Sequence, residues 1–463
     1  MAYQAMLADL IDKYNVGGPY YTSYPTLGRW KEDFKQEEYA QALVDFLKDP
    51  KEDHAFSLYV HYPYCIKICY FCICNALATS DKSRKQQMLN HICQELDLMG
   101  DLFEKHSIKP EIKEIHLGGG TPSYIDEDDF DIFIERLSRF VNLKALDEFA
   151  IEIDPRTVQP ERMYYYPKKG IQRISFGVQD FDPLIQETVG RVQSLELVKS
   201  LLTPEIRKQY RSVNFDFLYG LPKQTRDSFR RTVEITLKEF LPDRITLLRY
   251  AHVPHIKKHM KVLKEEDILP ETEKIKMFTE TVDTLLEHGY EMVGIDNFAL
   301  KHDDLAKGFN KKTAWRNFVG FTPGRVRHMI GVGPTATSAF GKYYSQSVYP
   351  VNEYYKMLED KRFPILRGYV LSQDDCIRRE VIFKTMCDRE VYFDQIGKQF
   401  GISFHKYFKE EIKALQGLVK DGMVELGKDF FKITEVGKYF VRHVCKVFDA
   451  YLKKEPAYKI TGP

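Results

Sequence analysis

The chain has 463 residues, of which 43% are hydrophobic, 29% charged and 13% aromatic. These proportions are typical of a globular protein and exclude a disordered, collagen-like or low-complexity chain. Lys and Arg number 68 against 67 Asp and Glu, so the net charge of +1 gives no global field for nucleic acid or anionic lipid. No apolar run reaches about 18 residues and no secretory signal begins the chain, so we expect a soluble cytoplasmic protein.

Short β-branched or aromatic runs alternate with longer amphipathic stretches over residues 56–296. The predicted strands are FSLYVHY, IKEIHLG, FAIEID, RISFGV, VNFDFLYG, RITLLRY and YEMVGID. The predicted helices lie near residues 84–106, 127–141, 160–169, 195–209, 227–240 and 270–288. This alternation predicts βαβ units with a parallel sheet, and six or seven units in a row favour an α/β barrel or an open part of one.

The alternation stops near residue 300, where glycine-rich turns and a tyrosine-rich stretch follow. From about residue 373 the patterns are helical, with a hairpin signal at MVELGKDFFKIT before a last amphipathic helix, which resembles a winged helix. We therefore predict an N-terminal segment, a barrel, a connecting segment and a mainly helical C-terminal domain. Their predicted bounds are 1–53, 54–300, 301–365 and 366–463.

Four of the eight cysteines lie within ten residues, at Cys65, Cys69, Cys72 and Cys74. Clustered thiols without a disulfide-like distribution indicate a metal centre. The first three have the spacing C-x3-C-x2-C directly after a predicted barrel strand, where barrel active sites form. Three thiolates can hold three irons of a 4Fe–4S cluster and leave the fourth iron open. The alternative is a structural zinc site with Cys74 or His61 as fourth ligand.

The spacing, with Phe71 before the third cysteine, resembles that of the radical S-adenosylmethionine (SAM) superfamily. Further motifs occur in the order KYNVGGPYYTSYPT, YVHYPYCIKICYFCICN, HLGGGTPSYI, IEIDPRTV, ISFGVQDF, DFLYGLPKQT and PDRITLLRYAHVP. Together they resemble the oxygen-independent coproporphyrinogen III oxidase family, and DDCIRREVI and KDGMVEL extend the resemblance over nearly the whole chain. The resemblance implies an α/β fold, with a partial TIM-like (β/α)6 barrel and a winged-helix-like C-terminal domain.

The resemblance implies a radical oxidoreductase of haem biosynthesis. Reductive cleavage of SAM yields a 5′-deoxyadenosyl radical, which removes a hydrogen from the β-carbon of a propionate. Loss of CO₂ and one electron leaves a vinyl group, and two such reactions convert coproporphyrinogen III into protoporphyrinogen IX. The implied ligands are a 4Fe–4S cluster, two SAM molecules and the tetrapyrrole. The implied electron donor is a flavodoxin or ferredoxin, and we expect a monomer without nucleic-acid or membrane partners.

The resemblance also implies a role for individual residues. The metal ligands are Cys65, Cys69 and Cys72, and Phe71 places its ring against adenine. The first SAM is contacted by Tyr59, Gly119, Glu152 and Thr337, and the second by Gly120, Thr121, Gln179, Arg191 and Asp216, with Ala251 as a backbone contact. No acid–base pair or nucleophile stands out as a catalytic residue, as expected where a radical supplies the reactivity.

Each of these assignments has a plain structural alternative. The glycine turn could simply open a helix with Thr121 or Ser123 as its cap. Glu152, on a predicted barrel strand, could form an ion pair with Arg173 on the next strand. The remaining polar residues could be solvated loop positions.

The chain departs from the family pattern at several positions. Tyr20 stands where an arginine is expected, Ile73 where a glycine is expected and Asn297 where a histidine is expected. The largest departure is residues 322–337, TPGRVRHMIGVGPTAT. Its Arg325, Arg327 and His328 either clamp propionates, because arginine pairs with carboxylate in a bidentate fashion, or belong to an exposed loop.

Two rival functions stay open, one because of these departures and one because of the winged-helix-like C-terminus. One is another radical reaction on a tetrapyrrole, such as haem methylation with ring opening, or haem handling by a paralogue. The other is a DNA-binding regulator with a cluster as sensor. The mixed charges of the C-terminal region disfavour the regulator, because DNA binding needs a basic surface.

Overall fold

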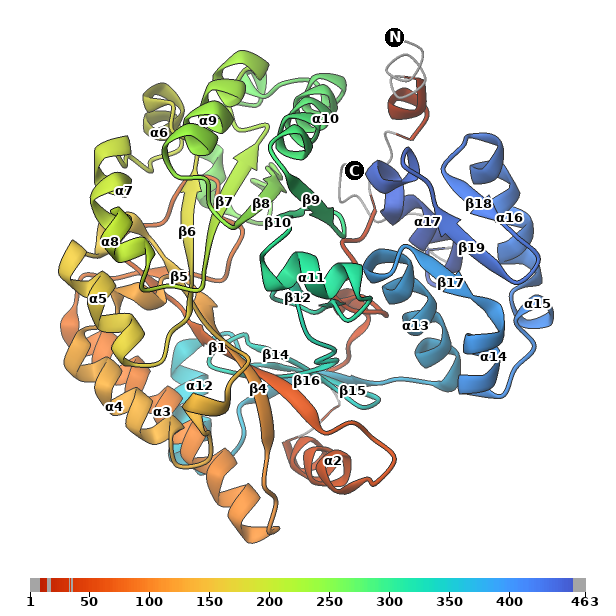
Figure 1. The fold of residues 1–463 in the computed structure, drawn as a ribbon. Helices are drawn as coiled ribbons and strands as arrows, with labels where there is room; N and C mark the ends of the chain where they lie inside the picture. The colour runs from red at the N-terminus through yellow and green to blue at the C-terminus, as the bar shows by residue number, and fades with distance from the viewer. Residues whose placement is uncertain (1–8, 15–17, 33, 35, 453–463) are drawn as a thin grey trace.

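A computed structural model of the chain describes residues 9–14, 18–32, 34 and 36–452 (Figure 1). Its centre is a curved sheet in which six parallel strands follow one another in chain order. These strands are β1 (Ala55–Tyr62), β4 (Glu111–Gly119), β5 (Glu148–Ile153), β6 (Arg173–Gln179), β7 (Ser212–Tyr219) and β8 (Arg244–Arg249). The predicted α/β class and partial (β/α)6 barrel are confirmed.

Helices lie outside the sheet, between its strands in sequence (Figure 1). They are α3 (Lys82–Lys105), α4 (Glu127–Leu137), α5 (Pro160–Lys168), α6 (Pro183–Thr188), α7 (Leu195–Leu201), α8 (Pro204–Arg207), α9 (Arg226–Glu239) and α10 (Glu271–Glu287). The Asp81 carboxylate accepts hydrogen bonds from the N–H groups of Ser83 and Arg84 and so fixes where α3 begins. The helix predicted over 195–209 is two helices, because Pro204 lacks an N–H and begins a new one.

The seventh predicted strand, YEMVGID, is not a further parallel strand. It forms β9 (Tyr290–Val293), which turns at Gly294 into β10 (Asn297–Leu300), and β10 pairs antiparallel with both β9 and β8. Gly294 has a φ of +63°, which glycine adopts easily because it has no Cβ. The parallel run therefore ends at β8, and the sheet ends at the edge strand β9.

The residues after 300, where the sequence indicates turns, extend the sheet beyond β1 at its other edge. The elements here are α11 (Asp304–Asn310), β11 (Trp315–Arg316), β12 (Phe321–Thr322), β13 (His328–Val332), β14 (Thr337–Phe340), β15 (Tyr343–Ser347), α12 (Val351–Glu359) and β16 (Ile365–Val370). β13 pairs in parallel with β1, and β14, β15 and β16 continue the sheet in antiparallel order. Gly331 permits this packing, because a Cβ there would lie 2.4 Å from the Thr337 carbonyl oxygen.

The C-terminal region packs beside the barrel and next to α11 (Figure 1). It contains α13 (Gln373–Cys387), β17 (Glu390–Tyr392), α14 (Phe393–Phe400), α15 (Phe404–Tyr407), α16 (Lys409–Lys420), β18 (Val424–Leu426), β19 (Phe430–Ile433) and α17 (Val441–Phe448). β17, β19 and β18 form a small antiparallel sheet between helices, as the hairpin signal predicts. Its apolar side chains are continuous with the core of the barrel.

The N-terminal segment joins the barrel to the C-terminal region. α2 (Gln36–Lys48) packs its apolar face inward, and the Tyr21 hydroxyl donates a 3.0 Å hydrogen bond to Asp449. Residues 15–17 of the predicted motif KYNVGGPYYTSYPT lie outside the described residues.

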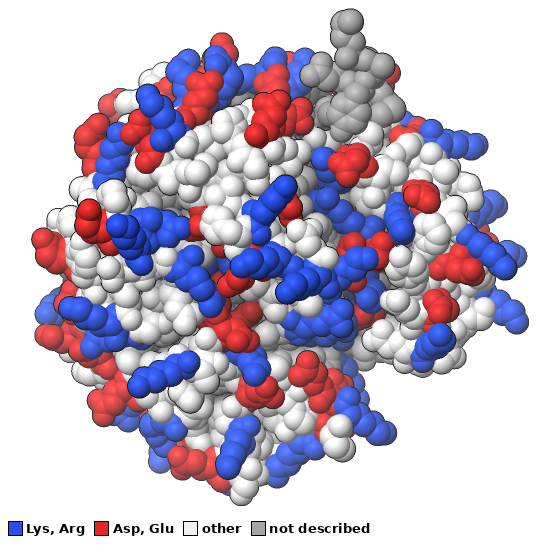
Figure 2. All heavy atoms as spheres, viewed as in Figure 1, with Lys and Arg blue, Asp and Glu red and all other residues white. Residues whose placement is uncertain are grey.

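Acidic and basic side chains are interspersed over the face shown in Figure 2. Among the described residues, no helix has the length and apolar character needed to cross a membrane.

Candidate active site

The inside of the barrel holds a cavity of about 670 Å³, a volume typical of a ligand-binding site. Side chains at alternating strand positions line it, because successive residues of a strand point to opposite faces. On β6 and β7 these include Arg173 and Ser175, then Asn214 and Asp216. The cysteine loop and residues 316–322 form further walls. This cavity is the candidate active site.

Cys65, Cys69 and Cys72 all line this cavity. Their loop begins at β2 (Tyr64–Cys65) and ends at β3 (Leu77–Ala78). The Thr121 hydroxyl donates a 3.1 Å hydrogen bond to Sγ of Cys65, and Arg191 Nη1 lies 3.5 Å from Sγ of Cys69 as a donor. Arg156 Nη2 also donates to Sγ of Cys69, at 3.6 Å, so the sulfur atoms of Cys65 and Cys69 have hydrogen-bond donors and those at Cys69 are cationic.

The chemistry of this donor set fits a polynuclear cluster better than a single ion. No three His, Cys, Asp or Glu side chains of the described residues converge closely enough to hold one metal ion. Three thiols beside a large cavity and a guanidinium group suit an anionic iron–sulfur cluster. Cys74 is exposed, and its hydrogen bond to Cys72 lowers the pKa of the Cys72 thiol to about 7.

The glycine turn after β4 lies against the backbone of the cysteine loop. Gly119 has a φ of +112°, and a Cβ at Gly120 would lie 2.4 Å from the Pro63 carbonyl oxygen. Gly119 requires glycine because of its left-handed φ, and Gly120 because the two backbones approach so closely. The helix-cap alternative is wrong for Thr121, because its side chain makes no cap hydrogen bond and donates to Cys65 instead.

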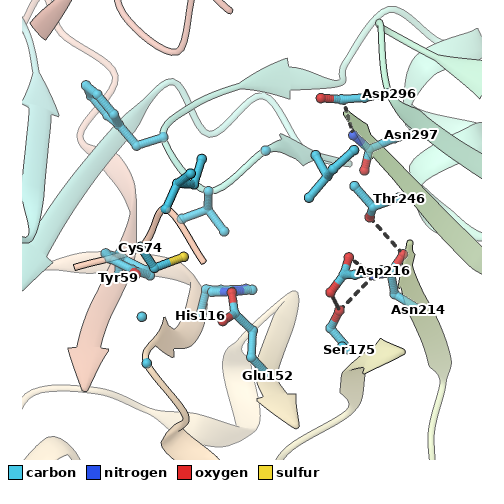
Figure 3. A pocket seen from close by; sticks show the side chains of 18 of the residues that line it. Tyr59, Cys74, His116, Glu152, Ser175, Asn214, Asp216, Thr246, Asp296 and Asn297 are labelled. Carbon is cyan, nitrogen blue, oxygen red and sulfur yellow. Dashed lines mark hydrogen bonds and ion pairs between the residues drawn. The ribbon is translucent and has the colours of Figure 1, made fainter. Parts of the chain in front are cut away.

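Glu152 faces the cavity, and 40% of its side-chain surface is exposed there (Figure 3). Its carboxylate accepts a 3.0 Å hydrogen bond from Nε2 of His116. Burial is the largest single effect and opposes ionisation, but the hydrogen bond and charge of His116, the charge of His61 and the Gly119 N–H together outweigh it and lower the pKa of Glu152. Arg173 pairs with Glu148 at 2.8 Å instead, so the predicted alternative of a Glu152–Arg173 ion pair is wrong.

Asp216 on β7 and Arg191 between α6 and α7 make ordered hydrogen bonds and are not solvated loop residues. Asp216 accepts hydrogen bonds from Ser175 at 2.7 Å and from Asn214 at 2.8 Å (Figure 3), and burial raises its pKa. Arg191 donates to the Gly177 carbonyl oxygen at 2.6 Å. Gln179, at the end of β6, has a φ of +69° and lines the cavity.

The remaining sequence-predicted residues divide into two groups. Tyr59, Phe71 and Ala251 line the cavity, and the Tyr59 hydroxyl lies 2.9 Å from Nδ1 of His61. Thr337 does not line it: the residue is buried on β14, where its carbonyl oxygen lies against Gly331 of β13. The structure thus gathers every predicted site residue except Thr337.

The residues that depart from the family pattern also fall into two groups: some line the cavity and others lie outside it. Tyr20, Ile73 and Asn297 line the cavity. The predicted cationic clamp is wrong, because Arg327 forms a bidentate ion pair with Glu380, at 2.9 and 3.2 Å, outside the cavity. The neighbouring Arg325 is exposed and donates to a backbone carbonyl. His328 is enclosed within β13, where burial lowers its pKa to about 3.

Several cavity residues were missed from the sequence. His116, Asn214 and Thr246 point inward from their strands, and a polar residue at every second position of an apolar run is the signal that could have identified them. Arg249 and Arg316 also line the cavity. No local pattern marks these two arginines, since only the fold brings them to the same cavity.

Comparisons with known proteins agree with this geometry. The Radical SAM superfamily model matches residues 59–236. The oxygen-independent coproporphyrinogen III oxidase of Escherichia coli K12 is 35% identical, over 96% of this chain and 95% of that protein, and that of Pseudomonas aeruginosa is 36% identical, over 96% of each. The solved structure of E. coli coproporphyrinogen III oxidase, HemN, matches with a TM-score of 0.88 and 33% identity, covering 95% of this chain and all of that one. The chain therefore belongs to the oxygen-independent coproporphyrinogen III oxidase family.

Proposed function

We propose that the protein oxidatively decarboxylates two propionates of coproporphyrinogen III to vinyl groups, giving protoporphyrinogen IX for haem biosynthesis in the cytoplasm. The observation that carries this proposal is the loop of three cysteines facing a barrel cavity lined by polar side chains from successive strands. The family relationship supplies the substrate, and the cavity supplies a place for a radical reaction shielded by the barrel walls.

Cys65, Cys69 and Cys72 are the proposed ligands of a 4Fe–4S cluster. When bound, this cluster would supply the electron that cleaves SAM to methionine and the 5′-deoxyadenosyl radical. The surrounding residues hold the loop in place: Thr121 donates to Cys65, and Arg191 donates towards Cys69. Because these donors carry partial or full positive charge, they also stabilise the thiolates.

Two groups of side chains support binding of two SAM molecules. Tyr59 and Glu152 lie on one side of the cavity, and the Asp216 network lies on the other (Figure 3). We assign Glu152 to the ribose hydroxyls of the first SAM, because an ionised carboxylate accepts hydrogen bonds from a diol. Asp216, with Gln179 and Arg191, is assigned to the second SAM. The proposed electron donor is a flavodoxin or ferredoxin acting on a monomer.

Anaerobic reconstitution followed by incubation with coproporphyrinogen III, SAM and a low-potential reductant tests the proposal. Mass spectrometry should detect two successive losses of CO₂ with two hydrogens, each accompanied by 5′-deoxyadenosine. The matched control lacks SAM and should return the substrate unchanged. A methylated or ring-opened product from haem, with coproporphyrinogen III left intact, would overturn the proposed substrate.

A further inference from the structure

Two arginines of the cavity wall have buried N–H groups without hydrogen-bond partners. Arg249 ends β8 and Arg316 ends β11, and only 4% of each side chain is exposed. Among the described residues, Nη1 of neither guanidinium has a hydrogen-bond partner. Leaving a buried charged donor unpaired is costly, so these two groups indicate a ligand that accepts from them.

The other contacts of these arginines hold their side chains in place without satisfying Nη1. Arg316 Nε donates to the Tyr20 carbonyl oxygen at 3.2 Å, and its Nη1 lies 3.5 Å from Asp296 without a hydrogen bond. Arg249 pairs with Glu271 through Nη2. Each guanidinium is thus anchored at one end and has an N–H available at the other.

The surroundings of Arg249 are electropositive. Burial lowers the pKa of Arg249, and the charge of Arg442 lowers it further. Burial and the charge of Arg249 lower the pKa of Lys274 to about 8. Glu271 pairs with both Arg249 and Lys274, so one carboxylate compensates two cations, and a further anion at Nη1 of Arg249 would stabilise them.

Arg249 borders a recess where the barrel, the N-terminal segment and α17 meet. Arg316 lines the main cavity and contacts Tyr20 and Asp296, which also line the recess. A small cavity of about 30 Å³ adjoins the main cavity there, and Tyr20, Arg249 and Asp296 line both. The Arg442 guanidinium lies over the Tyr20 ring, 4.4 Å from its centre, and closes the recess. The volume of the recess is about that of one water molecule, so it can take the end of a ligand's substituent but not a ring.

We infer that Arg249 and Arg316 bind a carboxylate of the tetrapyrrole and so fix which propionate reaches the radical. The inference rests on the proposed function and specifies its substrate contact. A guanidinium and a carboxylate form paired hydrogen bonds, which would satisfy both orphaned Nη1 groups. SAM also carries a carboxylate, but Asp296 lies across the cavity from Cys74 and Tyr59 (Figure 3). This position favours a propionate over the methionyl group of the first SAM, and the KM for SAM measured below distinguishes a propionate from the carboxylate of the second SAM.

The test compares Arg249→Gln and Arg316→Gln with Arg325→Gln, a control arginine that is exposed and outside the cavity. Each cavity variant should raise KM for coproporphyrinogen III about tenfold or more, because one charged hydrogen bond is lost. Iron content should stay at the wild-type level, because neither arginine contacts the cysteine loop. Arg249→Lys and Arg316→Lys, which retain charge and bulk, should recover part of the loss and check that folding is intact.

A second readout separates substrate recognition from a structural role. Fluorescence titration measures binding of coproporphyrin III and of its tetramethyl ester, which lacks carboxylates. Wild type should prefer the acid, and the double Gln variant should bind acid and ester equally. Unchanged affinity for the acid, or a raised KM for SAM instead, overturns the inference while the proposed function stands. A wild-type enzyme that neither binds coproporphyrin III nor converts coproporphyrinogen III overturns both.

Discussion

The Thr121 hydroxyl donates a 3.1 Å hydrogen bond to Sγ of Cys65. This contact joins the turn after β4 to the cysteine loop after β1, and the two segments also meet where Gly120 lies against the Pro63 carbonyl oxygen. The glycine turn thus has two roles: its backbone faces the cavity, and Thr121, the residue after it, supports the proposed metal ligand Cys65. Loss of either contact should therefore loosen the cluster loop.

Replacing Thr121 with valine should weaken retention of the cluster by about tenfold, the lower end of the effect expected for residues that support a metal ligand. Valine has the same shape but cannot donate to Cys65. The measurement is the rate at which an anaerobic chelator removes iron from the reconstituted protein. Thr121→Ser keeps the hydroxyl and should behave as wild type. Equal iron loss from the valine variant and wild type would show that the hydrogen bond does not hold the loop.

Serine substitution of Cys65, Cys69 or Cys72 should abolish iron binding and 5′-deoxyadenosine formation, because each supplies a proposed ligand. Cys74→Ser should retain the cluster and impair turnover, since Cys74 is exposed and supports Cys72 through a hydrogen bond. Iron content and the absorbance near 400 nm are the measurements. If Cys74→Ser loses iron as the other three do, Cys74 is a ligand and the open-iron arrangement is wrong. Cys376→Ser, on α13, is the control.

The sequence predicts the barrel well because its strands are local patterns. β1 and β4 to β8 are apolar runs separated by amphipathic helices, and such runs can be identified without knowing their neighbours. β13 escapes prediction because it is a short segment between glycine-rich turns and pairs with β1 far away in sequence. The seventh predicted strand is assigned the wrong direction for the same reason, since the turn at Gly294 decides it.

In the candidate site, too, residues in local motifs can be predicted from the sequence, whereas residues brought together by the fold cannot. The cysteines and the glycine turn are contiguous motifs, and the structure places them together. The cationic residues that line the cavity are different, because Arg249 and Arg316 are distant in sequence and neither belongs to a recognisable pattern. Arg327, which stands in the cationic stretch of the sequence, forms an ion pair with Glu380 and stacks on Trp315. Local charge density therefore does not identify the arginines that face a ligand.

Asp216→Asn should reduce the number of SAM molecules bound per reconstituted chain from two to one. Asp216 is the acceptor for Ser175 and Asn214, and an amide in its place loses a negative charge and half of its accepting capacity. Equilibrium dialysis with labelled SAM measures the stoichiometry. Asp227→Asn, at an exposed position of α9, is the control. Binding of a single SAM by wild type itself would contradict the assignment of Asp216.

Glu95 should make the stability of the fold depend on pH. This buried carboxyl of α3 accepts hydrogen bonds from the Gly333 N–H at 2.8 Å and the Tyr354 hydroxyl at 2.6 Å, and burial raises its pKa from 4.5 to about 7. Between these values the folded state keeps a proton that the unfolded state has lost. The free energy of unfolding should therefore fall as pH rises from about 4.5 to about 7 and change little above that.

Glu95→Gln should remove this dependence, because an amide keeps the hydrogen bonds and does not titrate. The difference in unfolding free energy between variant and wild type should grow in favour of the variant by up to about 3 kcal/mol between pH 5 and pH 8. Anaerobic denaturant unfolding at the two pH values measures it. Glu353→Gln, at an exposed position of α12, is the control and should leave the profile unchanged. If the free energy of unfolding of Glu95→Gln changes between the two pH values as much as that of wild type, the titrating group is another residue of the core.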